Sequence, residues 1–150
     1  MNNNEKQKIV DALINAGNGA NLNSLANTLS WVQFEIPGVN STQNSLHYEI
    51  RWSKFKDNAS GHDGKTLYIE LHAEKHNCAK KYKHIAKTMG LGRLEYFFYE
   101  SNRYIGFRIK GIKYDLNQVL NGINVGNSLI HNIIQDVLSL DRECKKNGFY

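Results

Sequence analysis

Residues 65–74 read KTLYIELHAE, and residues 46–52 read LHYEIRW. In both segments apolar and polar residues alternate, which is the pattern of a strand with one buried face. A polar connection that contains Gly61 and Gly64 joins the two segments, so we predict an antiparallel hairpin. The odd positions of residues 67–73 and the even positions of residues 46–52 must face one core, because a slip by one residue would turn every apolar side chain outward.

The polar row of this hairpin includes two histidines, His47 and His72, and the glutamates Glu49 and Glu70. One register that keeps the apolar faces together sets His47 opposite His72 and Glu49 opposite Glu70. A slip by two residues would keep the faces and change the partners. We therefore predict that the four side chains share one face of the sheet, with their exact neighbours left open.

A second hairpin is predicted around Ser101 and Asn102, from residues 93–100 and 103–113. A two-residue turn there places Tyr99 opposite Tyr104 and Glu95 opposite Arg108. The residues predicted to face the core are Leu94, Tyr96, Phe98, Ile105, Phe107 and Ile109. The residues predicted on the other face, with Glu95, are Phe97, Tyr99, Tyr104, Arg108 and Lys110.

Helical spacing of apolar residues appears in residues 4–16, 22–29, 77–89 and 127–146, and residues 31–36 alternate as a short strand. Residues 116–126 are ambiguous. We predict an α+β fold in the order α-(α)-β-ββ-α-ββ-α, with helices packed on one face of an antiparallel sheet of four or five strands. Residues 5–30, EKQKIVDALINAGNGANLNSLANTLS, also resemble the first two helices of a winged helix-turn-helix. A recognition helix would follow Ser30, where the strand-like WVQFEIPG stands instead.

The 150 residues predict one domain, residues 1–150. No apolar run approaches the roughly 20 residues that a membrane-spanning helix needs. The first residues, MNNNEKQK, have no apolar core, so no secretory signal is predicted. We expect a cytoplasmic protein in which Cys78 and Cys144 are reduced thiols.

The net charge is +5, and the cations are segregated along the chain. Residues 75–93 contain six Lys or Arg and no acid, and residues 103–113 contain four more, again with no acid. Cations gathered on one side are what contact with phosphate groups requires, and aromatic neighbours can stack on bases. The predicted nucleic-acid-binding residues are Lys80, Lys81, Lys83, Lys87, Arg93, Arg103, Arg108 and Lys110.

The four residues His47, Glu49, Glu70 and His72 form a candidate catalytic patch. Imidazole and carboxylate groups suit zinc, manganese or iron, so a divalent metal is a candidate cofactor. Crowded carboxylates can also raise one pKa into the range of acid–base catalysis. The alternative is that the row is simply the solvated face of a half-buried strand, with Arg51 or solvent relieving the carboxylates.

Three functions follow, in order of preference. The first is a small basic protein that binds nucleic acid or a nucleoprotein complex, a profile that fits accessory proteins of phages, plasmids or defence systems. The second is a metal-dependent hydrolase or nuclease that uses the His/Glu patch. The third is a protein–protein interaction module or homodimer, with the apolar carboxy-terminal helix at the interface.

Overall fold

The computed structural model describes residues 1–56 and 59–150. Within them it has the predicted α+β fold, but the antiparallel sheet is larger than expected, with seven strands. The helices are α1 (Asn3–Gly19), α2 (His76–Thr88), α3 (Leu116–Asn124) and α4 (Ile130–Lys146), with a short 3-10 helix, η1 (Ala59–Gly61). The strands are β1 (Ser24–Asn27), β2 (Trp31–Phe34), β3 (Leu46–Arg51), β4 (Thr66–Ala73), β5 (Leu94–Tyr99), β6 (Tyr104–Ile109) and β7 (Tyr114–Asp115).

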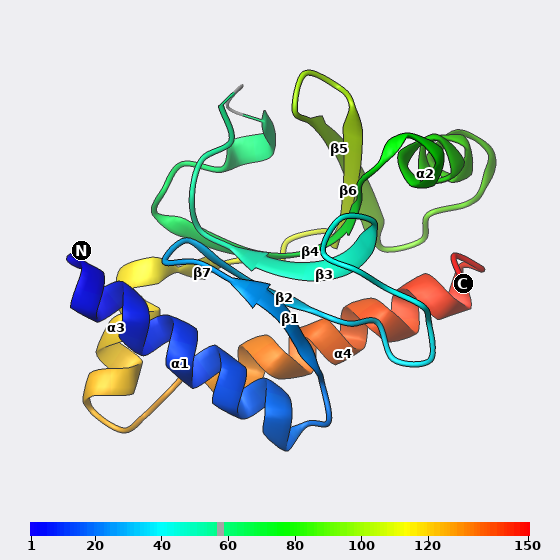
Figure 1. Ribbon diagram of the computed structural model, residues 1–150. Coiled ribbons are helices and arrows are strands. Elements are labelled where there is room, and N and C mark those ends of the chain that lie inside the picture. Colours follow the sequence, from blue (N-terminus) through cyan, green and yellow to red (C-terminus); the bar gives the residue numbers. More distant parts are fainter. Residues whose placement is uncertain (57–58) are drawn as a thin grey trace.

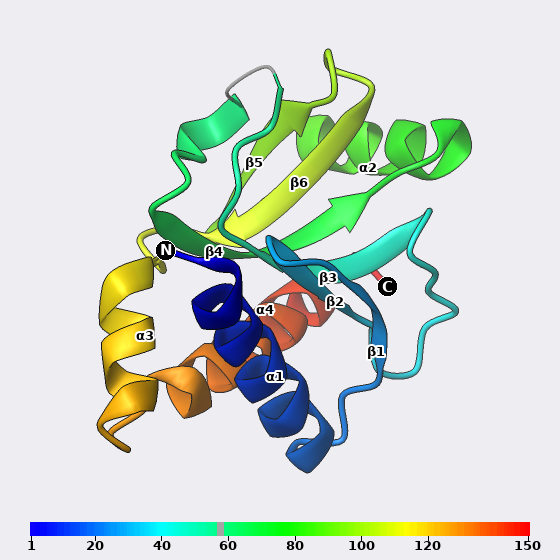
Figure 2. The same cartoon turned by 60° about the vertical axis from the view of Figure 1, so that its left-hand side comes forward.

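The strands follow the order β1-β2-β3-β4-β6-β5, and β7 pairs with the first residues of β4. The two predicted hairpins, β3–β4 and β5–β6, therefore join in one sheet through the pairing of β4 with β6. Figures 1 and 2 show the sheet twisting strongly between the β1 and β5 edges. Figure 1 shows η1 above β3 and β4, on the side of the sheet away from α1 and α4.

The predicted register is confirmed in both hairpins. His47 lies opposite His72 and Glu49 opposite Glu70 in β3–β4. Tyr99 lies opposite Tyr104 in β5–β6. Alternation specified which rows of β3 and β4 face the core, because the apolar rows are buried on one side of the sheet, but it also allowed a register two residues away.

The main core lies between that apolar side and the helices. Figure 1 shows α1, α3 and α4 together below the sheet. The hydroxyl of Tyr48 in β3 donates to the carboxylate of Asp141 in α4, which satisfies both groups in the interior. Helix α2 joins the same core at the β6 end, where Tyr82 contacts the rings of Phe107 and Phe149.

The other side of the sheet is not solvated, which contradicts the interpretation of the His/Glu row as a wet face. A small second core covers it, formed by Phe55, Phe97 and Tyr99, with Tyr104 packed beside them. Phe55 comes from the β3–β4 connection, so this loop closes over the sheet. The predicted core assignment in β5 is wrong at Tyr96, which is 43% exposed, because β5 is an edge strand and turns its other row inward.

Residues 22–29 were predicted as a helix, and the structure places strand β1 there. Leu22 is buried where the chain leaves α1, and the backbone N–H of Glu35 donates to the carbonyl of Asn23. Pairing with β2 thus provides hydrogen-bond partners for the backbone of this segment, although the spacing of its leucines alone predicts a helix. Residues 116–126, left ambiguous, form α3, which Asp115 caps by accepting from the N–H of Gln118. Among the described residues, no helix has the length and apolar character required to cross a membrane.

Candidate metal centre

Four side chains meet on the covered face of β3 and β4. His47, Glu49, Glu70 and His72 are exposed by only 0 to 3%. The structure therefore brings together all four residues of the predicted catalytic patch, in the interior and not in an open cleft. Buried ionisable groups need partners, because desolvation of an unpaired charge costs several kcal/mol or more.

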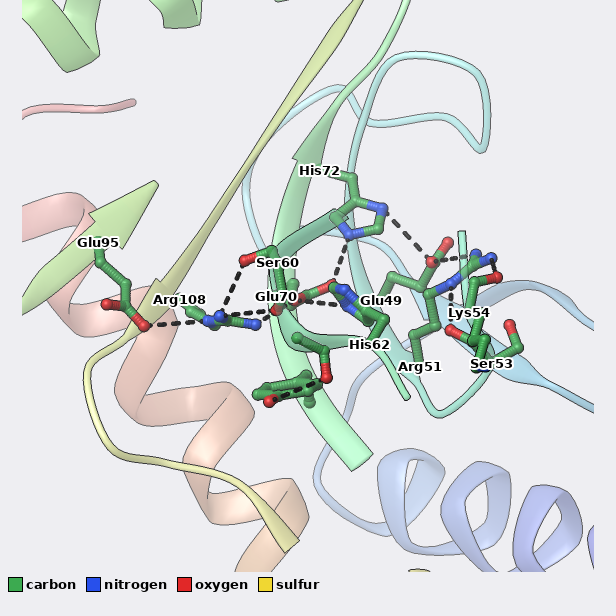
Figure 3. Close-up of polar contacts among 12 residues, drawn as sticks. Glu49, Arg51, Ser53, Lys54, Ser60, His62, Glu70, His72, Glu95 and Arg108 are labelled. Atoms are coloured by element: carbon green, nitrogen blue, oxygen red, sulfur yellow. Dashed lines mark hydrogen bonds and ion pairs between the residues drawn. The ribbon is translucent and has the colours of Figure 1, made fainter. Parts of the chain in front are cut away.

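Glu70 stands at the centre of one half of this cluster (Figure 3). His62 Nε2 lies 3.0 Å from Glu70 Oε2, and His72 Nε2 lies 2.9 Å from Glu70 Oε1. Arg108 Nη1 donates to Oε2 at 3.2 Å. Burial alone would raise the pKa of Glu70, but the hydrogen bonds from His62 and His72 outweigh it and hold the pKa at about 2.

Glu49 forms the other half. Its Oε1 accepts from Gln33 Nε2 at 2.9 Å, and its Oε2 accepts from Arg51 Nη1 at 3.2 Å. Burial would raise the pKa of this carboxyl as well. The charges of His72, His47 and Arg51 reverse the effect, and the pKa lies well below its ordinary value. Both glutamates are therefore carboxylates and accept hydrogen bonds only.

Among the described residues, three buried side-chain atoms have no hydrogen-bond partner: Gln33 Oε1, His47 Nε2 and His72 Nδ1. All three belong to this cluster. An orphaned polar atom in the interior costs about 1–3 kcal/mol, so native proteins seldom leave one without a reason. A ligand that is missing from the coordinates is one such reason.

The two imidazoles are held in the tautomers that leave these nitrogens with a free lone pair. His47 Nδ1 lies 3.2 Å from the carbonyl oxygen of Thr42, so Nδ1 carries the proton. His72 Nε2 donates to the Glu70 carboxylate, so its Nδ1 is unprotonated in the neutral ring. Metal-binding histidines almost always donate their other N–H to a carbonyl or carboxylate in this way.

Glu74 adds a third donor beside the two nitrogens. One donor atom from each of His47, His72 and Glu74 lies within 4.8 Å of the other two. His72 Nδ1 is 3.9 Å from Glu74 Oε2, which also accepts from the hydroxyl of Tyr99 at 2.8 Å. Ligand atoms around a tetrahedral zinc ion stand about 3.3–3.5 Å apart, given metal–ligand bonds of about 2.0–2.2 Å. The three donors, up to 4.8 Å apart, would have to close by up to about 1.5 Å to reach this spacing.

The charge of the cluster also favours a cation. Four carboxylates (Glu49, Glu70, Glu74, Glu95) face two guanidinium groups, because Arg108 also pairs with Glu95. Two negative charges therefore remain when the histidines are neutral. Burial lowers the pKa of His72, but the charge of Glu49 and the bond to Glu70 outweigh it, so the pKa is raised.

The rings of His72 and His62 are surrounded by aromatic side chains. The His72 ring lies 4.8 Å from the ring of Tyr99 and 6.0 Å from that of Phe55. The His62 ring packs at 4.6 Å from Phe55. Glu74 is the partly exposed member, at 23%, and lies where the cluster reaches the surface.

Several residues of the site were missed by sequence reasoning. Glu74 shares the parity of Glu70 and His72, and that signal could have included it, but it was assigned to the end of the strand. His62 comes from the irregular β3–β4 connection, whose sequence has no period that would place it. Gln33 enters only through the pairing of β2 with β3. Tyr99 was predicted on the polar face of the second hairpin, and the pairings of β5 with β6 and of β6 with β4 bring that face to the cluster.

The predicted nucleic-acid-binding residues separate into three groups. Lys80, Lys83, Lys87 and Arg103 line one groove beside α2. Arg108 is only 12% exposed and is bound to Glu70, Glu95 and Ser60 in the interior cluster. Lys81, Arg93 and Lys110 are exposed but do not line the groove.

Comparisons of this chain with protein-family models, with curated proteins and with solved structures find no match. The chemistry of the site therefore rests on its own residues.

Proposed function

We propose that this protein binds one divalent transition-metal ion through His47 Nε2, His72 Nδ1 and the carboxylate of Glu74. The observation that carries the proposal is the pair of buried imidazole nitrogens without a hydrogen-bond partner, His47 Nε2 and His72 Nδ1, which face Glu49 oxygens at 3.6 Å and 3.4 Å. Each belongs to a ring whose other nitrogen is already fixed by an acceptor. A metal ion would satisfy both lone pairs at once, whereas a proton on either ring would satisfy only one.

The donor set favours zinc over magnesium or calcium. Two imidazole nitrogens and one carboxylate are typical of zinc sites, whereas Mg²⁺ and Ca²⁺ take oxygen ligands. Glu70 and Tyr99 would act as outer partners, because they hold His72 and Glu74 in place. Glu49 would contribute charge from close by, with both of its oxygens engaged by Gln33 and Arg51.

A second candidate function, metal-assisted hydrolysis, is favoured by one observation. The site has three protein donors, and the partial exposure of Glu74 places one edge near solvent. Catalytic zinc sites have three protein ligands and keep the fourth position for water, which the metal makes nucleophilic near pH 7. Metal-dependent hydrolysis is therefore our second hypothesis, and it presupposes the metal.

Isothermal titration of chelator-treated protein with Zn²⁺ tests the proposal. Wild type should bind one ion per chain and should not bind Ca²⁺. His47→Ala should weaken affinity by more than about 100-fold, the upper end of the cost of losing an outer partner. His131→Ala is the control, because this exposed histidine lies on α4, away from the cluster.

Glu74→Gln is a second variant, in case His47→Ala fails to fold. It is expected to fold, because Glu74 is partly exposed and the amide can still accept a hydrogen bond from Tyr99. A folded Glu74→Gln protein, checked by circular dichroism, should also bind zinc weakly. Zinc binding that is unchanged in both His47→Ala and Glu74→Gln would overturn the proposal. A hydrolase screen is informative only after that result is known.

A further inference from the structure

Helix α2 carries one continuous basic stripe. Its exposed side presents His76, Lys80, Lys83, His84 and Lys87, which recur at intervals of three and four residues. This spacing puts the side chains on one face of the helix, opposite the buried face of Ala79, Tyr82 and Ile85. From His76 to Lys87 the stripe is about 16 Å long at 1.5 Å per residue.

The stripe forms one wall of a groove. Arg103, from the turn between β5 and β6, forms the other wall, and the groove has a volume of about 330 Å³. An adjoining hollow of about 210 Å³ is lined by His76, Lys83, Arg103 and Tyr104. All six side chains that line the larger groove are basic or imidazole groups.

The two walls are joined before any ligand arrives. Lys83 Nζ donates to the carbonyl oxygen of Asn102 at 2.6 Å, which holds the turn against α2. Arg103 lies over the ring of Tyr104 at 5.1 Å, and its Nη2 donates to the Tyr104 hydroxyl at 3.2 Å. Lys83 therefore has a structural role, whereas Lys80 and Lys87 extend from the exposed face of the helix.

The stripe is unfavourable for the helix itself. Like charges three or four residues apart destabilise a helix by about 0.2–0.5 kcal/mol per pair. Within residues 1–56 and 59–150, no salt bridge neutralises Lys80, Lys83, Lys87 or Arg103. The first turn of α2 has no acid, and its N-cap Lys75 makes no capping bond. A helix that keeps such unfavourable like-charge contacts, with no salt bridge or cap to offset them, departs from the usual rules of helix stability. Departures of this kind are expected at functional sites.

We infer that this groove binds the phosphate backbone of a nucleic-acid strand. One sign of charge along both walls is the arrangement that phosphate contacts require. The length of the stripe fits several successive phosphates and exceeds what a single inorganic phosphate needs. In sequence, the acids nearest the groove residues are Glu74, whose Oε2 accepts from Tyr99, and the exposed Glu100, three residues before Arg103. The inference is independent of the metal, because no groove residue belongs to the proposed ligand set.

Fluorescence anisotropy with labelled single-stranded and duplex 20-mers across a salt series tests the inference. Wild type should bind with an affinity that falls linearly with salt on a log–log plot. Lys80→Ala/Lys87→Ala should reduce the slope by about two, since each lost phosphate contact removes about one. The matched control is Lys8→Ala/Lys113→Ala, which removes the same charge from exposed positions elsewhere.

Two further measurements distinguish binding of the nucleic-acid backbone from zinc-dependent binding and from general attraction of polyanions. The measurement is repeated with zinc and with chelator, and the same slope change is expected in both. Competition with polyglutamate at equal charge should displace the oligonucleotide poorly. Equal effects of the two double variants, equal displacement by polyglutamate, or binding that does not depend on salt would overturn the inference.

Discussion

His47 and His72 lie opposite each other in β3 and β4, and each ring has one hydrogen-bonded nitrogen and one buried nitrogen without a hydrogen-bond partner. The bonded nitrogens face the Thr42 carbonyl and the Glu70 carboxylate. The other two nitrogens face the two oxygens of one carboxylate, Glu49, at 3.6 Å from His47 Nε2 and 3.4 Å from His72 Nδ1, so they border one small volume. The central claim is that a metal ion occupies this volume.

Glu70→Gln should destabilise the protein by about 3 kcal/mol, because removing one partner of a buried ion-pair network costs about 3–5 kcal/mol. The amide would remove the charge that Glu70 presents to the guanidinium of Arg108 and to the rings of His62 and His72, and Arg108 would keep only Glu95 as a carboxylate partner. Urea unfolding of chelator-treated protein measures the change. The exposed Glu100→Gln should stay within about 0.5 kcal/mol. A loss below about 1 kcal/mol for Glu70→Gln would mean that the network is not the structural centre described above.

Zinc should raise the free energy of unfolding of wild type, because an ion that binds only the folded state stabilises it. At free zinc 100 times the dissociation constant, the gain is about 2.7 kcal/mol. At that same zinc concentration, Glu74→Gln should gain much less. Chemical unfolding with zinc and with chelator gives both values. An equal gain in the two proteins would place the ion elsewhere.

Tyr99→Phe should lower zinc affinity by about 10-fold, the lower end of the effect of losing an outer partner. The hydroxyl of Tyr99 donates to Glu74 Oε2 at 2.8 Å and so fixes the carboxylate. Tyr104→Phe is the control, since the Tyr104 hydroxyl accepts from Arg103 in the basic groove. Calorimetric titration should show the loss only for Tyr99→Phe, with unchanged circular dichroism. A similar loss in both variants would contradict the role given to Tyr99.

Gly106→Ala should destabilise the protein by about 1–3 kcal/mol through overpacking. A Cβ at Gly106 would lie 2.3 Å from the tip of the Phe97 ring, which covers this glycine opposite His72. The smaller, more flexible side chain of Phe97→Leu should reduce the cost, so a double-mutant cycle in urea should show a favourable coupling. Additive effects would show that Phe97 does not pack directly on Gly106.

The sequence predicted the hairpins and the face of each row, because strict alternation leaves only one row of each strand apolar. The pairing of His47 with His72 was one of the registers that alternation allows, since a slip by two residues keeps the same faces, and the structure selects it. Burial of the polar row could not be predicted in the same way. It depends on Phe55 and His62, which lie in a connection without periodicity, and on the distant aromatic residues Phe97 and Tyr99.

The cation pattern illustrates a second limit of sequence reasoning. Charge counts along the chain cannot separate Arg108 from Arg103, although the two are five residues apart. Arg108 points from β6 into the covered face and pairs with Glu70, whereas Arg103 stands in the exposed turn. Position within the hairpin decides which guanidinium is part of the interior and which can meet an anion.

The most direct test of the metal centre is an anomalous difference map from crystals of the zinc-loaded protein, measured on both sides of the zinc absorption edge. We expect one peak about 2.0–2.1 Å from His47 Nε2 and from His72 Nδ1, with the carboxylate of Glu74 as a third ligand. A peak at other histidines, such as His76, His84 or His131, with no density between His47 and His72, would contradict the account.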